Sequence, residues 1–239
     1  MSERRVEELV LRDLRTLASA EGLANWMFAQ FSDRVAGKVV EVGAGIGTFS
    51  ERILGLGVED LLILEPEEIA AGVLRSRFGS DPRVRLANDS LPRSRILAAE
   101  AGSFDFALCQ NVLEHIRDDS GAAHDIAAAL RPGGQLGLLV PASPRLFGNL
   151  DRAYGHCRRY ESDRLRRLIE EVGLRVDALY PFNLLGIPGW WLQNRRANPQ
   201  ISQRSLRVYE ALLRFWRPVE RRWQPPAGLS LIVRATKPA

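Results

Sequence analysis

The chain has 239 residues, of which 46% are hydrophobic and 26% are charged, a composition that suits one α/β domain with an added lid. Its formal net charge of +4 is concentrated at residues 195–222, where eight arginines accompany two glutamates, so the remainder is near neutral. This distribution argues against a surface that binds nucleic acid along its whole length. The two cysteines exclude a disulfide framework and indicate a reducing compartment.

The N-terminal residues are charged throughout and lack the apolar segment of a secretory signal. No apolar run approaches the ~20 residues that a membrane-spanning helix needs. We therefore expect a cytoplasmic protein.

Apolar residues at helical spacing predict two helices before residue 35, at 6–20 and 23–34. Strand-like runs then alternate with helices. The expected strands are 39–42, 61–65, 84–87, 104–109, 135–141, 174–180 and 229–235. The expected helices between them are 47–56, 67–78, 91–101, 119–130 and 161–172. This alternation predicts an α/β fold with a mostly parallel sheet and helices on both faces.

Two intervals interrupt the alternation, a long loop at residues 142–160 and an insertion of 48 residues at 181–228. Each follows a strand, and ligands bind at the carboxyl ends of strands in open α/β sheets. Long loops inside compact domains are usually functional. We therefore divide the chain into an N-terminal helical cap (1–34), an α/β core (35–180), a helical lid (181–228) and a last core strand (229–239).

The stretch VVEVGAGIGTF, residues 39–49, indicates a strand that enters a glycine turn and then a helix. It lacks the Gly-Lys-Ser/Thr of a P-loop, and its third glycine comes one residue early for the dinucleotide fingerprint. Glu41, just before the turn, would also repel a phosphate. The structural alternative is a tight turn without a ligand.

A ligand with a cationic amino acid end and a ribose, but no phosphate, fits this segment better. Gly43, Gly45 and Gly47 allow a ligand to approach the backbone closely. Glu41 can attract an ammonium group, directly or through water, and Glu65 at the end of the second strand can accept both ribose hydroxyls. S-adenosylmethionine carries an ammonium, a sulfonium, a ribose and an adenine, and is the ligand that we predict.

Five segments, in this order, resemble those of Rossmann-like (class I) S-adenosylmethionine-dependent methyltransferases of the small-molecule type. They are EVGAGIGTF, LILEPEE, LANDSLP, FDFALCQNVLEHIRDD and LRPGGQLGLLVPA. The resemblance covers residues 35 to about 180. It implies a seven-stranded sheet whose last strand is inserted antiparallel beside the sixth.

The resemblance also implies which residues bind the cofactor. They are Glu41, Gly43, Ala44, Gly45, Gly47, Glu65, Pro66, Asn88, Asp89, Ser90, Gln110, Asn111, Val112 and His115. Asp89 would accept a hydrogen bond from the adenine amine, and Gln110, Asn111 and Val112 would line the methionine end. His115 matches a position near the methyl group, although a structural role between loop and helix is the alternative. No metal is expected.

The segment LDRAYGHCRRYESDRL, residues 150–165, resembles a Gly-His-x-Arg-Arg-Tyr loop of a bacterial subset of the family. His156 is the only histidine on the loop that should face the acceptor, and imidazole suits a general base. The alternative is that His156 and Tyr160 fix the loop by hydrogen bonds. Arg158 and Arg159 could hold an acidic acceptor bidentately, or they could pair with acids of the same segment.

The insertion is aromatic and basic, and residues 203–217 have helical spacing. Three interpretations are open: a lid over an apolar acceptor, a helix on an anionic membrane surface, or a solvated helix at the sheet edge. We favour the lid. The expected catalytic residues are thus His156, Tyr154 and Tyr160, and the expected substrate-binding residues are Arg158, Arg159, Trp190 and Trp191.

The sequence therefore predicts an S-adenosylmethionine-dependent methyltransferase that acts on a small-molecule, lipid or glycan-type acceptor and releases S-adenosylhomocysteine. O-methylation is the expected chemistry. The absence of a Pro-Pro motif after Asn111 disfavours DNA adenine as the acceptor, and no RNA-binding module is recognisable. The alternative is a scaffold that binds the cofactor without methyl transfer, or that assists a rearrangement or cyclisation. The acceptor and the oligomeric state do not follow from the sequence.

Overall fold

The structure, a computed structural model, describes residues 16, 19–196 and 202–239. Most of the helix expected at 6–20 lies outside the described residues. Within them, no helix is long and apolar enough to cross a membrane.

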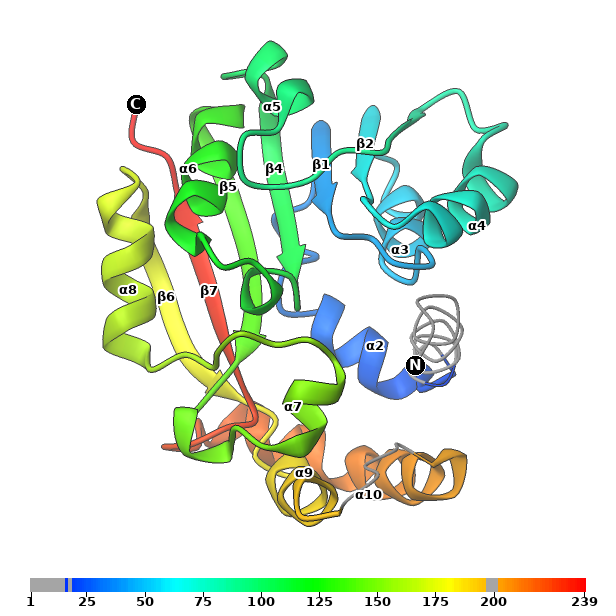
Figure 1. Ribbon diagram of the computed structural model, residues 1–239, viewed down its shortest axis with the longest axis vertical. Coiled ribbons are helices and arrows are strands. Elements are labelled where there is room, and N and C mark those ends of the chain that lie inside the picture. Colours follow the sequence, from blue (N-terminus) through cyan, green and yellow to red (C-terminus); the bar gives the residue numbers. More distant parts are fainter. Residues whose placement is uncertain (1–15, 17–18, 197–201) are drawn as a thin grey trace.

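A seven-stranded sheet with the order β3-β2-β1-β4-β5-β7-β6 organises the molecule (Figure 1). The strands are β1 Lys38–Val42, β2 Asp60–Leu64, β3 Val84–Ala87, β4 Phe104–Gln110, β5 Leu130–Pro141, β6 Arg175–Phe182 and β7 Ser230–Thr236. Neighbours among β1 to β5 pair in parallel, whereas β7 is antiparallel to both β5 and β6. This arrangement confirms the predicted fold class and the position of the last strand.

The central strands are apolar on both sides, as expected for a parallel sheet covered on both faces. In β1 (KVVEV) and β2 (DLLIL) every residue after the first is buried. One of these buried residues, Glu41 of β1, is a carboxylic acid, so the strand carries a polar group into the core next to the glycine turn.

Helices cover the two faces of the sheet. The helical segments are α2 Glu21–Phe28, α3 Ser50–Gly55, α4 Glu68–Phe78, α5 Arg95–Ala99, η1 Leu113–His115, α6 Asp119–Ala129, η2 Pro144–Leu146, α7 Asn149–Ala153, α8 Ser162–Glu171, α9 Gly186–Asn194 and α10 Gln203–Arg222. The core of one face includes residues of α5, α6 and α8, and that of the other face includes residues of α2, α3, α4 and α10. In Figure 1, α9 and α10 lie together at the lower end of the molecule.

Three expected helices differ in extent from the observed ones. The helix expected at 23–34 ends at Phe28, because the chain turns there and places Phe31 over Gly137 of β5. A Cβ at Gly137 would lie 2.7 Å from the Phe31 ring, so the missing side chain makes room for it. The helix expected at 91–101 is limited to α5, and α10 continues past Pro218 to Arg222.

Two carboxylates attach α10 to the rest of the molecule. Glu210 accepts hydrogen bonds from the backbone N–H groups of Gly22 and Leu23 at 3.0 and 2.7 Å, which caps α2. Glu220 accepts from the backbone N–H of Leu184 at 3.2 Å. The insertion is therefore tied both to the N-terminal helix and to the residues that follow β6.

Candidate functional site

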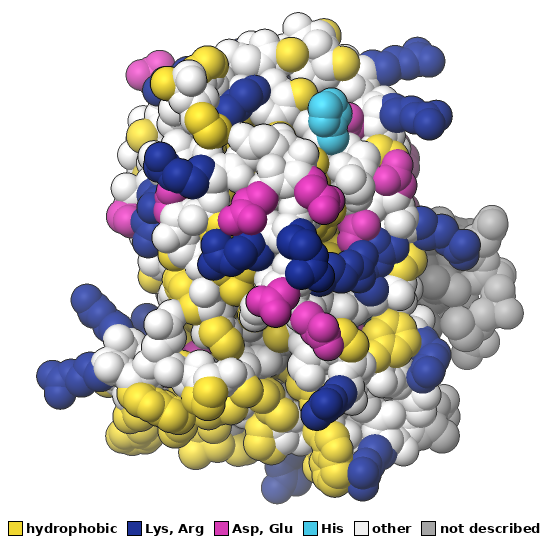
Figure 2. Space-filling view, turned by 90° about the vertical axis from the view of Figure 1, so that its left-hand side faces the viewer, with side chains coloured by type: hydrophobic (Ala, Val, Ile, Leu, Met, Phe, Trp, Pro, Cys, Tyr) yellow, Lys and Arg dark blue, Asp and Glu magenta, His cyan; other side chains and the backbone are white. Residues whose placement is uncertain are grey.

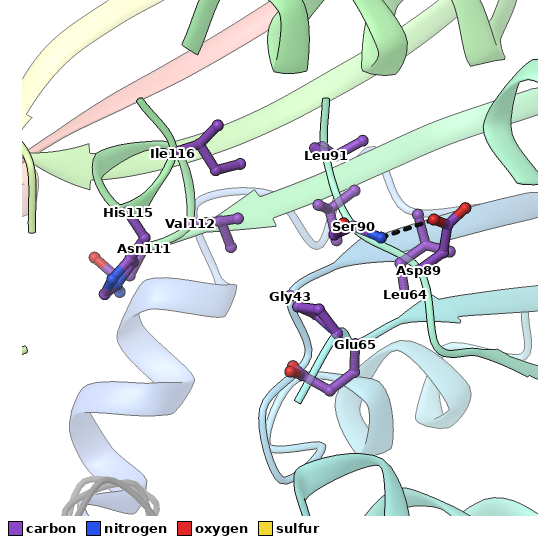
Figure 3. A pocket seen from close by; sticks show the side chains of 12 residues that line it. Gly43, Leu64, Glu65, Asp89, Ser90, Leu91, Asn111, Val112, His115 and Ile116 are labelled. Atoms are coloured by element: carbon purple, nitrogen blue, oxygen red, sulfur yellow. Dashed lines mark hydrogen bonds between the residues drawn. The ribbon is translucent and has the colours of Figure 1, made fainter. Parts of the chain in front are cut away.

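A pocket of about 240 Å³ lies at the carboxyl ends of β1, β2 and β4 (Figure 3). The residues that line it are Val42, Gly43, Leu64, Glu65, Pro66, Asp89, Ser90, Leu91, Asn111, Val112, His115 and Ile116. In Figure 3, Asn111, Val112 and His115 lie on one side, and Gly43, Glu65 and Ser90 on the other. This is the edge of the sheet at which an open α/β fold binds its ligand.

The glycine turn is built so that only glycine fits at its key positions. Gly43 has a φ of +69°, and a Cβ there would lie 2.4 Å from Cγ2 of Val112. Gly47 has a φ of +84°, and a Cβ there would lie 2.4 Å from the Phe78 ring. Asn111, at the end of β4, also has a positive φ of 54°. On both sides of the pocket, the backbone thus has positive φ values, which residues with a side chain rarely adopt.

Glu41 lies behind the turn rather than in the pocket wall. Its side chain is buried and accepts a hydrogen bond from Oγ of Ser50 at 2.5 Å. Burial and, less strongly, the charge of Glu65 raise the pKa of Glu41 to about 7, although the hydrogen bond from Ser50 opposes the shift. A nearby cation would favour the ionised form of this carboxyl group.

Glu65 connects the end of β2 to the glycine turn. One carboxylate oxygen accepts from the N–H of Gly45 at 2.7 Å, and the other from the N–H of Glu67 at 3.0 Å. Burial raises its pKa, and these two bonds oppose the shift. Each carboxylate oxygen has a second lone pair, so the group can still accept hydrogen bonds from ribose hydroxyls.

Asp89 lines the pocket, but its carboxylate serves the neighbouring loop. It accepts hydrogen bonds from Oγ of Ser94 at 2.8 Å, from the N–H of Ile96 at 3.1 Å and from the N–H of Ser90 at 2.8 Å. Although burial opposes them, these bonds lower its pKa. In Figure 3 the carboxylate points away from the opposite wall. Asp89 therefore orders the start of α5 while it lines the pocket, and its expected hydrogen bond from the adenine amine stays a prediction.

Eight of the expected cofactor residues line the pocket: Gly43, Glu65, Pro66, Asp89, Ser90, Asn111, Val112 and His115. The other six are not part of its wall: Glu41, Ala44, Gly45, Gly47, Asn88 and Gln110. Sequence reasoning missed the apolar walls Val42, Leu64, Leu91 and Ile116. For Val42 and Leu64, the sequence offered one indication, which is that each is the last residue of its strand.

Gln110 is a buried residue whose amide is not satisfied by the protein. Among the described residues, neither its Nε2 nor its Oε1 has a hydrogen-bond partner. It is the last residue of β4, directly before Asn111 of the pocket wall. Buried polar groups are normally paired, so an amide left open here fits a polar ligand such as the amino acid end of S-adenosylmethionine.

Four aromatic side chains form what we call the loop cluster: His115, Tyr154, His156 and Trp190. The His115 and His156 rings meet edge to face with centroids 4.7 Å apart, and Tyr154 lies 6.1 Å from His156 and 6.4 Å from Trp190. Burial, and secondly the proximity of His156, lower the pKa of His115 to about 4. Because His115 also lines the pocket, the loop cluster is the pocket's immediate neighbour.

Asp151 orients His156. It is fully buried, and its Oδ1 lies 2.9 Å from Nδ1 of His156 and 2.8 Å from Nε of Arg159. Burial raises the pKa of Asp151, but the bonds and charges of these two residues and of the Gly148 N–H outweigh it and keep the acid ionised. An ionised Asp151 favours the neutral tautomer of His156 in which Nδ1 carries the proton and Nε2 the lone pair. Sequence reasoning missed this role of Asp151.

The two adjacent arginines of the loop are engaged in the protein. Arg159 is 3% exposed, donates to the carbonyl of Ala142 at 2.9 Å besides its bond to Asp151, and stacks on Trp190 at 4.7 Å. Arg158 instead forms an ion pair with Asp119 at 2.6 Å. The expectation that both arginines hold an acidic acceptor is therefore wrong, because both charges are already paired.

Tyr160 and Trp191 also lie elsewhere than expected. Tyr160 is completely buried, and its hydroxyl donates to Asp119 at 3.0 Å. It fixes the loop to α6 and cannot reach an acceptor, so its expected catalytic role is wrong. Trp191 is 47% exposed, with Arg195 stacked 3.6 Å from its ring, and it belongs to the surface rather than to the loop cluster.

Glu114 is a further residue that sequence reasoning missed. It is completely buried next to His115, and among the described residues neither carboxylate oxygen has a hydrogen-bond partner. Burial raises its pKa to about 8, although the charge of Arg159 opposes the shift. The only sequence signal was its place beside His115 in the Leu-Glu-His segment.

Comparison with known proteins agrees with this geometry. A model of the methyltransferase domain family matches residues 9–179, well over half of the chain. A ubiquinone biosynthesis O-methyltransferase of Xanthomonas axonopodis pv. citri (strain 306) is 35% identical over 103 residues, which are 41% of this chain and 41% of that protein. The chain thus matches about two fifths of the length of such curated relatives.

Solved structures share the fold. An S-adenosylmethionine-dependent methyltransferase from Mesorhizobium loti superposes with a TM-score of 0.62 at 15% identity, over 85% of this chain and 93% of the other. The N-methyltransferase NodS from Bradyrhizobium japonicum WM9, solved with S-adenosyl-L-homocysteine, gives 0.56 at 16% identity, over 90% and 85%. Together with the domain match, these findings confirm the predicted family: the chain belongs to the methyltransferase domain family.

Proposed function

We propose that the protein transfers the methyl group of S-adenosylmethionine to a hydroxyl oxygen of a small, lipophilic acceptor. The observation that carries the proposal is the contact between the pocket at the strand ends and the loop cluster, because His115 belongs to both. The similarity to O-methyltransferases supports oxygen as the acceptor atom.

The polar groups around the pocket match those of the cofactor. Glu41 and Gln110 would hold its amino acid end, and Glu65 would hold its ribose. The apolar residues Leu91 and Ile116 would contact its adenine. When bound, the cofactor supplies a methyl group on a sulfonium. An oxygen lone pair of the acceptor attacks the methyl carbon in line with the C–S bond, and the sulfur leaves with the electrons of that bond.

His156 is the group that acts on the acceptor hydroxyl. Its side chain is 9% exposed, and Asp151 holds Nδ1, so the lone pair of Nε2 is free to take the hydroxyl proton. Tyr154 and Trp190 form walls of the acceptor site next to it. The Gly-His-x-Arg-Arg-Tyr loop thus contributes one reactive side chain, while Arg159 and Tyr160 fix the loop.

The test uses radiolabelled S-adenosylmethionine, a panel of alkylphenols and hydroxylated polyprenyl lipids, and a His156→Ala variant. General base catalysis is worth about 10²- to 10⁴-fold, so turnover should fall by that factor while affinity for S-adenosylhomocysteine is kept. His124→Ala, an exposed histidine of α6, is the matched control. Label on nitrogen or carbon would overturn the choice of oxygen. Binding without transfer, or with a rearranged product, would favour the scaffold alternative.

We also propose that residues 1–34 cap the cofactor end and residues 181–228 form the lid on the acceptor side. The core would comprise residues 35–180 together with the last segment, 229–239. The hydrogen bonds from Gly22 and Leu23 to Glu210 support a cap and a lid that move as one unit.

A second part of the proposal is a peripheral contact between α10 and an anionic membrane surface, with the protein itself cytoplasmic. The helix has one apolar stripe that faces the core, with Leu206 and Leu213 buried. Its second apolar stripe is exposed and repeats every three or four residues: Val208, Leu212, Phe215, Val219 and Trp223. Phe215 is 81% exposed. Figure 2 shows hydrophobic side chains gathered at the lower end of the molecule, where Figure 1 places α9 and α10.

Charge complements the exposed stripe. The arginines of α10 are Arg204, Arg207, Arg214, Arg217, Arg221 and Arg222. Among the described residues, none of them forms an ion pair with an acid. A helix with an apolar stripe beside unpaired arginines favours the interface of an anionic bilayer, where each basic residue contributes about 1 kcal/mol. A lipophilic acceptor would be reached from such a surface.

Vesicle sedimentation tests the contact, using phosphatidylcholine vesicles with and without phosphatidylglycerol. The wild type should pellet with the anionic vesicles only, and Phe215→Glu should stay in the supernatant. Leu56→Glu, which changes a 47% exposed leucine outside α10, is the control and should behave as the wild type. Equal, negligible pelleting of all three proteins would contradict the contact. Dimerisation that Phe215→Glu abolishes would assign the stripe to a second copy of the chain.

A further inference from the structure

Glu114, His115 and His156, which we call the Glu-His-His cluster, bring one carboxylate and two imidazoles together. Their ligand atoms lie within 4.8 Å of one another. Both carboxylate oxygens of Glu114 are buried, and the described part of the chain offers neither of them a hydrogen bond. A buried carboxylate without partners is costly unless something else satisfies it.

The backbone holds the two segments of the cluster together. The N–H of Cys157 donates to the carbonyl of Glu114 at 2.7 Å, which ties the loop after α7 to η1. The N–H of His156 donates to the carbonyl of Asp151 at 2.9 Å. The backbone of the loop that carries His156 is therefore fixed relative to η1, which carries Glu114 and His115.

The bond from His156 to Asp151 has the form of an outer-shell contact at a metal centre. A histidine ligand usually donates its second ring N–H to a carboxylate or carbonyl, which orients the ring and raises its basicity. Here Nδ1 of His156 lies 2.9 Å from Oδ1 of the fully buried Asp151, which leaves Nε2 as the ligand atom.

We propose that the Glu-His-His cluster binds a divalent transition-metal ion of the zinc type. One carboxylate and two imidazoles form a ligand set that zinc accepts, and they leave coordination positions open. Mg²⁺ is disfavoured because it prefers oxygen ligands. Zinc–ligand bonds of about 2.0–2.2 Å require the three ligand atoms to approach one another by roughly an ångström.

This inference rests on the proposed methyl transfer and replaces one of its steps, because the ion takes over from His156 the activation of the acceptor hydroxyl. An acceptor hydroxyl oxygen would occupy an open position on the ion, which lowers the pKa of the hydroxyl. The proton leaves to water, the oxygen lone pair forms the new C–O bond, and the C–S bond of the sulfonium breaks with its electrons left on sulfur. The lone pair of His156 Nε2 then serves the ion instead of taking the proton.

The experiment uses untagged, chelator-treated protein of residues 1–239. It is titrated with Co²⁺, whose visible absorption reports coordination by protein ligands independently of turnover. One ion per chain should bind to the wild type and to His124→Ala, whose substituted histidine lies on α6 outside the cluster. Glu114→Gln and His156→Ala should lose the absorption band. Asp151→Asn should weaken binding by about 10- to 100-fold, as expected for an outer-shell residue.

Absence of binding to the wild type, or equal binding to Glu114→Gln, would overturn the proposal. X-ray absorption of the Co²⁺-loaded wild type gives a result that does not depend on whether the variants fold. Two imidazole nitrogens with oxygen would support the site, whereas a sulfur ligand or a shell without imidazole would overturn it. Failure of methyl transfer with the ion bound would count against the proposed function alone.

Discussion

The pocket at the strand ends and the loop cluster are neighbours that are held in place by different kinds of contact. In the pocket, backbone groups hold the side chains: the N–H groups of Gly45 and Glu67 bind the carboxylate of Glu65. In the loop, side chains hold side chains, since Asp151 binds both His156 and Arg159. The pocket therefore takes its shape from the sheet and the turns that follow its strands. The loop cluster depends on a few buried charges, so single substitutions there should affect stability as well as function.

Asp151→Asn should give the largest effect on stability. It removes the charge that Arg159 pairs with, and this arginine is 3% exposed. Leaving a buried charge without its partner costs about 3 to 5 kcal/mol. Urea denaturation should show this loss, while Asp163→Asn, at an exposed position of α8, should stay within about 0.5 kcal/mol of the wild type. Equal midpoints for the two variants would show that the loop does not depend on this ion pair.

Gly43→Ala tests the pocket, where we expect a smaller loss of stability together with a loss of cofactor affinity. The new Cβ would lie 2.4 Å from Val112, in a backbone conformation with a φ of +69°. Overpacking of this kind costs about 1 to 3 kcal/mol. In Gly72→Ala the new Cβ has no neighbour within 4 Å, and the helical position should gain about 0.5 to 1 kcal/mol. Thermal melts and a cofactor titration of both variants measure the difference.

Glu41→Gln should give the smallest effect and one that depends on pH. The folded pKa of Glu41 is about 7 and its ordinary value is 4.5, so the folded chain binds more protons between these values. The contribution of Glu41 to the unfolding free energy therefore falls as pH rises through this window, and the variant lacks this contribution. Denaturation at several pH values measures the difference, and identical profiles for both proteins would contradict the raised pKa.

The same group should make cofactor binding pH-dependent. An ammonium next to Glu41 favours the ionised carboxylate, so the pKa falls in the complex and affinity is highest above pH 7. Below pH 7, affinity should fall by up to about tenfold per pH unit until the pKa of the complex is reached. Glu41→Gln should remove this dependence, and a slope that persists in the variant would assign it to another group.

The sequence was sufficient for the sheet and for most of the pocket wall. Strand ends in a parallel sheet share one edge, so Gly43, Glu65 and Asn111 could be placed together from their positions at or just after the ends of predicted strands. The sequence does not show which donors a carboxylate meets, so the bonds to Asp89 from Oγ of Ser94 and from the N–H of Ile96 were not foreseen.

Pairing in the loop could not be predicted, because a sequence shows charges but not their partners. Arg158 and Arg159 are adjacent, yet they bind different carboxylates, Asp119 and Asp151. Long-range packing likewise decides which side chains of the insertion are buried. Trp190 joins the loop cluster whereas its neighbour Trp191 is exposed, and nothing local distinguishes the two residues.

Calorimetric titration with S-adenosylhomocysteine tests the central claim most directly, with the wild type compared with Glu65→Ala and Glu67→Ala. Glu65 lines the pocket, whereas the side chain of Glu67 is exposed two residues further on. We predict binding of one ligand per chain that weakens by about 1.5 to 3 kcal/mol in Glu65→Ala, as for the loss of a charged hydrogen bond, and is unchanged in Glu67→Ala. No binding to the wild type, or equal binding to all three proteins, would contradict the account.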